Sequence, residues 1–75
     1  MADQLLDAKG LNCPLPILKT KKMLQTLEAG QVLEVLATDP GAVKDFAAFC
    51  RTTGNEIVEQ SEGDGVFKFL IKKSA

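Results

Sequence analysis

The sequence contains no histidine, no tryptophan and no tyrosine, and it has only two cysteines. A structural zinc site uses four cysteine or histidine ligands, so this chain cannot build one. Catalysis by a cysteine–histidine pair is excluded as well, because no imidazole is present. There is also no CxxC motif, since the residue three positions after Cys13 is Pro16. We therefore predict no metal site, no cofactor and no thioredoxin-like dithiol.

Long apolar runs and a strong net charge are missing too. The formal net charge is −1, with acids and bases mixed along the chain, which gives no electrostatic basis for binding nucleic acid. No apolar run approaches the roughly 18 residues that a membrane span needs. The first residues, Met1 to Gln4, lack the basic and apolar segments of a secretory signal. We expect a cytoplasmic protein that binds neither nucleic acid nor membrane.

The pattern of apolar residues predicts a small α/β protein. Seventy-five residues suit one domain with a single core, here residues 1–75. Strand-like segments cover residues 4–8, 31–38, 55–62 and 66–73, and helical spacing covers residues 14–28 and 39–53. With right-handed crossovers, the order β-α-β-α-β-β predicts a two-layer sandwich. It consists of a mixed four-stranded sheet with both helices on one face.

Local signals define the ends of these elements. Gly30 suits the position just after the first helix, and Gly54 the position after the second. Asp39 and Pro40 predict the N-cap and first residue of the second helix. Asp64-Gly65 predicts a tight hairpin turn between the last two strands. The expected buried stripes are Ile17, Thr20, Leu24 and Leu27 on the first helix, and Val43, Phe46, Ala47 and Cys50 on the second.

Alternation within the strands separates two faces of the sheet. Leu33, Val35 and Ala37 share the face expected to meet the helices. The opposite face is half apolar and half charged: Val32, Leu36, Val66 and Leu70 lie beside Glu34 and Lys68. Such a face is either a partner surface or simply an open side of the sheet, and the sequence leaves both possibilities open.

The most informative residue is Cys13, which stands between Asn12 and Pro14 and three residues before the second proline, Pro16. Proline is tolerated in the first turn of a helix, so this segment places a thiol at a helix N-terminus. Free backbone N–H groups and the positive end of the helix dipole would favour a thiolate there. We predict that Cys13 is an exposed nucleophile, rather than a small buried hydrophobic residue.

The segment from Gly10 to Pro16, Gly-Leu-Asn-Cys-Pro-Leu-Pro, resembles the Gly-Leu-x-Cys-Pro-x-Pro signature of the TusA/SirA family of sulfur carriers. The similarity continues through Asp39-Pro40 and Phe49-Cys50 into the final hairpin, so it covers nearly the whole chain. The resemblance implies that Cys13 carries sulfur as a persulfide. It also implies a carrier used stoichiometrically, with sulfurtransferase activity, rather than a turnover enzyme.

The same resemblance implies the partners. A cysteine desulfurase or a rhodanese would supply the sulfur, and a relay protein would accept it for tRNA thiolation, molybdenum cofactor synthesis or dissimilatory sulfur oxidation. The family's docking surface includes the region of Asp45, so Asp45 is a candidate donor contact. Lys19, Lys21 and Lys22 form either a solvated helix face or a patch for an acidic partner. We expect the protein to act as a monomer.

Two other classes of function remain as alternatives. A thiol-redox protein would use Cys13 with a resolving cysteine or a base, and neither is found nearby in the sequence. Cys50 lies on the apolar stripe of the second helix and is expected to pack in the core, with a disulfide to Cys13 as the lesser alternative. An RNA- or protein-binding module is suggested by fold analogy alone.

Overall fold

The computed structural model describes residues 2–74. It contains six elements in the predicted order: β1 (Gln4–Ala8), α1 (Leu15–Leu24), β2 (Val32–Ala37), α2 (Ala42–Thr53), β3 (Glu56–Gly63) and β4 (Val66–Lys72). Every strand lies within one residue of its predicted limits. The left-handed conformations of Asp64 (φ 54°) and Gly65 (φ 77°) form the expected tight turn between β3 and β4.

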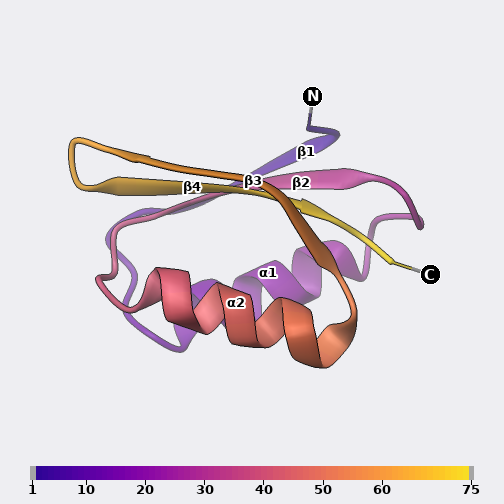
Figure 1. Cartoon of the computed structure of the whole chain (residues 1–75), viewed down its shortest axis with the longest axis horizontal. Coiled ribbons are helices and arrows are strands. Elements are labelled where there is room, and N and C mark those ends of the chain that lie inside the picture. Colours follow the sequence, from indigo (N-terminus) through magenta and orange to yellow (C-terminus); the bar gives the residue numbers. More distant parts are fainter. Residues whose placement is uncertain (1, 75) are drawn as a thin grey trace.

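The strands form one sheet in the order β1-β2-β4-β3, and both helices cover the same face, as predicted (Figure 1). β1 and β2 are parallel, with Ala8 opposite Ala37, whereas the other two pairings are antiparallel. Because β1 and β2 point the same way, the chain leaves both strands at the same edge of the sheet. Both helices therefore begin at that edge, and this brings their N-termini close together.

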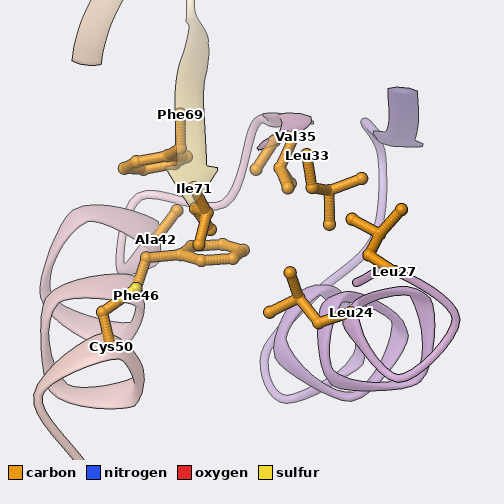
Figure 2. Close-up of a cluster of buried hydrophobic side chains, with 10 residues drawn as sticks. Leu24, Leu27, Leu33, Val35, Ala42, Phe46, Cys50, Phe69 and Ile71 are labelled. Carbon is orange, nitrogen blue, oxygen red and sulfur yellow. The ribbon is translucent and has the colours of Figure 1, made fainter. Parts of the chain in front are cut away.

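The core lies between the helices and the inner face of the sheet (Figure 2). The residues predicted for that face of β2 are completely buried, as are Phe69 and Ile71 of β4. From α2, Phe46 is fully buried and stacks on Phe69 with 4.6 Å between ring centroids. Leu24 of α1 and Leu27, just after the helix, close the core on that side, and Pro16 and Thr20 of α1 are buried as well.

The predicted end of the first helix was wrong. α1 stops at Leu24 rather than continuing to residue 28, and tighter turns follow, in which Leu27 N–H donates to the Leu24 carbonyl. The Thr26 hydroxyl donates to the Met23 carbonyl, a local bond that competes with helix continuation. Gly30 has a positive φ of 90° but is not the helix cap, because it turns the chain into β2 instead.

The predicted start of the second helix was also wrong. α2 begins at Ala42 with Gly41 as its N-cap, and no side chain caps it. Asp39 accepts from the Ala42 N–H through its backbone carbonyl, which leaves the Asp39 carboxylate free for another role. The buried stripe is rotated as well, with Ala42 buried and Ala47 exposed. At the other end Gly54 is left-handed (φ 81°) and closes the helix as predicted.

The face of the sheet opposite the helices carries no covering layer among residues 2–74 (Figure 1). Its predicted apolar residues are half-buried, and Leu5 and Val58 are among the exposed large hydrophobic side chains. Within the described residues, neither helix has the length and the apolar character that a membrane crossing requires.

Candidate functional site

Cys13 lies at the edge of the sheet where both helices begin. It stands one residue before Pro14, the N-cap of α1, and its side chain is exposed. The Cys13–Pro14 peptide bond is cis, and Pro16 is buried in the first turn of the helix. The Asn12 carbonyl accepts from the Leu15 N–H at 2.9 Å, closing the turn around the thiol. Residues 10–14 therefore form a short loop, the cysteine loop, in which the thiol is exposed to solvent.

Hydrogen bonds hold the cysteine loop in place, and one of them joins it to the loop between β2 and α2. Gly10 N–H donates to the Thr38 hydroxyl oxygen at 2.9 Å, although the two residues are 28 positions apart in the sequence. Leu11 N–H donates to the Ala8 carbonyl at 3.2 Å. Gly10 adopts a positive φ of 82°, which a residue with a side chain rarely takes. The Gly10–Thr38 bond ties the cysteine loop to the segment that leads into α2.

Two carboxylates from that second loop and helix stand beside the thiol. The Cys13 Sγ atom and one oxygen from each of Asp39 and Asp45 all lie within 4.8 Å of one another. Asp39 follows β2, and Asp45 lies in the first turn of α2. Gly41 lies between them, with a carboxylate oxygen of each 3.6 Å from where its Cβ would be. The site is thus one thiol facing an acidic pair.

The acidic pair reverses the predicted ionisation of Cys13. A hydrogen bond with Asp45, partial desolvation and the negative charges of Asp45 and Asp39 all raise the pKa of the thiol above its usual value. A neighbouring negative charge disfavours the thiolate, because it adds a second anion to the same site. The expectation of a thiolate at neutral pH was therefore wrong for the free protein.

The expected backbone donors are largely missing too. Pro14 and Pro16 have no N–H group, and the N–H of Leu15 is already bonded to the Asn12 carbonyl. Of the first turn, only Ile17 remains to donate toward an anion at the helix end. A helix dipole contributes about 0.3–1 kcal/mol at an exposed site, and with a single remaining donor it does not outweigh two carboxylates within 4.8 Å of the sulfur.

The thiol and the two carboxylates could together hold a cation, a possibility that counting only cysteines and histidines did not address. The set combines one soft, exposed sulfur with two hard oxygens from half-buried carboxylates. It offers three ligands, whereas a structural zinc site is closed by four, mostly sulfur and nitrogen. This donor set does not match a resident metal centre.

The second cysteine occupies a different environment. Cys50 is 6% exposed and packs in the core beside Phe46, as the apolar stripe predicted (Figure 2). Burial raises the pKa of its thiol to about 11, so it stays protonated across the physiological range. Both cysteines are free thiols. Cys50 is therefore a packing residue, and only Cys13 is open to a partner.

Replacing Cys50 with serine is expected to lower the free energy of unfolding by on the order of 1 kcal/mol or more, because the change buries a hydroxyl in the core. Urea unfolding followed by circular dichroism measures this loss. Cys13→Ser makes the same atomic change at an exposed position and is the matched control, with an expected effect within about 0.5 kcal/mol. Equal stability losses in the two variants would contradict the assignment of Cys50 to the core.

The three predicted docking lysines do not form one patch. Lys19 and Lys22 line a hollow of about 290 Å³ with Leu6 and Met23, between α1 and β1. Lys21 lines another hollow of about 210 Å³, which reaches the end of α2 and includes Phe49. Of the predicted docking residues, Asp45 is the one that the structure places against Cys13.

The sequence did not predict that Cys13 lies beside the carboxylates of Asp39 and Asp45. Asp39 was predicted to be the N-cap of the second helix instead. A signal was available in the topology. Both helices follow strands that pair in parallel, so the segments after β1 and β2 must meet at one edge of the sheet. Side chains at the two helix N-termini are therefore neighbours, however far apart they lie in the sequence.

Comparison with known proteins points to one family. Residues 4–73 match the family described as "Sulfurtransferase TusA". The sulfur carrier protein TusA of Allochromatium vinosum is 65% identical over 72 residues, covering 96% of this chain and 95% of that protein. TusA of Pseudomonas putida is 42% identical over 73 residues, covering 97% and 91%.

A solved structure has the same fold. The crystal structure of a SirA-like protein from Desulfitobacterium hafniense superposes with a TM-score of 0.83 at 31% sequence identity. The match covers 96% of this chain and 99% of that one. The two-layer sandwich inferred from the order of the elements is therefore confirmed by an independent structure.

Proposed function

We propose, because this chain belongs to the TusA family and is a sulfur carrier, that Cys13 is the residue that carries the sulfur, in the form of a persulfide. One observation supports this choice above the others. The sequence has two cysteines, and Cys13 is exposed whereas Cys50 is buried in the core. A sulfur that passes between proteins has to meet the partner's sulfur directly, so the carrier thiol must be accessible.

The transfer step follows from thiol–disulfide chemistry. The Cys13 sulfur attacks the outer sulfur of a persulfide on the donor, the donor's sulfur–sulfur bond breaks, and a new sulfur–sulfur bond forms on Cys13. The donor is left as a thiol and takes up the proton that Cys13 gives away. Starting from a donor persulfide anion and the Cys13 thiol, atoms and charge balance without an external oxidant or reductant, and Cys13 ends as a persulfide anion.

Membership of the family implies the proposed partners. The donor is a protein that forms a cysteine persulfide, for which a cysteine desulfurase or a rhodanese is the proposed source. The acceptor is a relay protein that leads to tRNA thiolation, molybdenum cofactor synthesis or sulfur oxidation. We propose that the chain acts as a monomeric single domain in the cytoplasm and works stoichiometrically. Asn12, Pro14 and Pro16 set the conformation of the cysteine loop around Cys13. Docking is proposed to involve Asp45 and the lysines of α1, Lys19, Lys21 and Lys22.

Sulfur loading tests this proposal directly. Incubation with a cysteine desulfurase and cysteine is expected to add one sulfur atom to the protein, and peptide mapping is expected to place it on Cys13. Accurate mass is needed, because one sulfur and two oxygens share a nominal mass. Addition of a reductant should remove the sulfur. Stepwise oxygen addition under peroxide, with no sulfur uptake from the desulfurase, would favour a thiol-redox protein instead.

A further inference from the structure

We infer that Asp45 is a positioning residue for the carrier cysteine: its carboxylate holds the Cys13 thiol and, in the free protein, keeps the proton on that sulfur. The inference rests on the proposed role of Cys13 and adds how its thiol is kept unreactive before a partner binds. Asp39 acts in the same direction from the neighbouring loop.

Two chain segments that are distant in sequence are held close together at this site. The Sγ atom and the two carboxylate oxygens lie within 4.8 Å of one another, and the bond between Gly10 and Thr38 ties the cysteine loop to the segment that bears Asp39 and leads into α2. Asp45 belongs to a helix whose next residue, Phe46, is fully buried. The carboxylate is therefore held by the core rather than by a mobile loop.

The other charged groups around the site do not neutralise this pair. Within residues 2–74, Lys9 forms an ion pair with Asp7 at 3.9 Å, on the strand side of the cysteine loop. The first charged residue of α1 is Lys19, which faces the hollow beside β1. On α2, Lys44 is exposed. Among the described residues, the two acids thus face the thiol with no cation paired to them within 4.0 Å.

The hydrogen bond and both negative charges raise the pKa of Cys13, in agreement with the geometry. At neutral pH a larger share of the carrier is then a neutral thiol, which is a weak nucleophile. Small disulfides and oxidants would react slowly with it. Once sulfur is loaded, the same carboxylates repel the persulfide anion, which favours its transfer onward.

Removing the Asp45 charge provides the test. Asp45→Asn is expected to lower the pKa of Cys13, seen as a displacement of the pH–rate profile for reaction with bis(2-hydroxyethyl) disulfide. This reagent is neutral, so its encounter rate does not depend on the charge removed. For each pH unit by which the pKa falls, the thiolate fraction at neutral pH rises about tenfold. The nucleophilicity of the thiolate falls about threefold at the same time. The reaction rate at neutral pH should then rise roughly threefold.

Three variants complete the test. Glu56→Gln removes one negative charge at the opposite end of the sheet, where Glu56 of β3 lies opposite Lys72 of β4 in the strand register. It is expected to leave the pH–rate profile unchanged. Asp45→Glu should retain most of the wild-type pKa. Asp39→Asn should move it in the same direction as Asp45→Asn, and it replaces that variant if Asp45→Asn fails to fold. Mass mapping assigns the reacted residue as Cys13.

The inference is overturned if Asp45→Asn and Asp39→Asn titrate like the wild type, or if Glu56→Gln moves the profile equally. It is also overturned if the wild-type Cys13 pKa lies below that of an ordinary cysteine. None of these measurements uses a sulfur donor. A failure of sulfur loading would therefore count against the proposed function alone, and an unchanged profile against the role of Asp45 alone.

Discussion

Cys13→Ser is expected to abolish sulfur loading completely. A serine hydroxyl cannot form a persulfide, and the remaining cysteine is 6% exposed with a pKa of about 11, so it cannot replace the lost thiol. Intact mass after incubation with a desulfurase and cysteine should show no added sulfur. The folded structure should persist, since Cys13 is exposed and surface substitutions usually change stability by less than about 0.5 kcal/mol.

Cys50→Ser is the control for this prediction. It should unfold more readily yet still take up one sulfur per molecule on Cys13. Two results would refute the assignment of roles: sulfur bound stably by the Cys13→Ser protein, or a folded Cys50→Ser protein that takes up none. The pair of variants separates loss of the carrier atom from loss of structure, because each changes only one of the two cysteines.

Phe46→Ala is expected to cause the largest loss of stability, about 3–5 kcal/mol, since it empties the centre of the core. Phe46 is fully buried and stacked on Phe69, so both its own contacts and those of the partner ring are lost. Small domains have total stabilities near the low end of about 5–15 kcal/mol. The variant should therefore be substantially unfolded in moderate urea, where the wild type is native.

Urea unfolding of Phe46→Ala and Phe49→Ala gives the comparison. Phe49 lies on the same helix but is half-buried at the edge of the core, so its truncation should cost clearly less. Phe46→Leu, which keeps most of the volume, should recover much of the loss. Equal midpoints for Phe46→Ala and Phe49→Ala would show that the core is not centred on Phe46. The result also bears on the site, since Phe46 anchors the helix turn that holds Asp45.

Much of the fold could be predicted because its signals are local. The hairpin turn at Asp64-Gly65 needs positive φ at both positions, and those residues adopt it readily. The alternation of Leu33, Val35 and Ala37 requires a strand with one buried face. The helix limits were less predictable. Thr26 ends α1 early through a side-chain bond, and Asp39 is not the cap of α2.

The prediction that Cys13 is the exposed thiol also came from local information. Two prolines after a cysteine bring a helix start and a thiol together, and the spacing of the apolar residues on α2 placed Cys50 in the core. These inferences depend on neighbours within a few positions in the chain. The sequence by itself therefore determined the order of the elements, the sandwich fold and which thiol is exposed and which is buried.

Only the tertiary structure decided the electrostatic character of the site. The parallel pairing of β1 and β2 and the bond from Gly10 to Thr38 bring Asp39 and Asp45 against Cys13, across a long separation in sequence. Charge interactions depend on distance through space, which local patterns do not encode. The helix end alone indicated a thiolate, but the folded molecule places two acids beside that sulfur, and they raise its pKa.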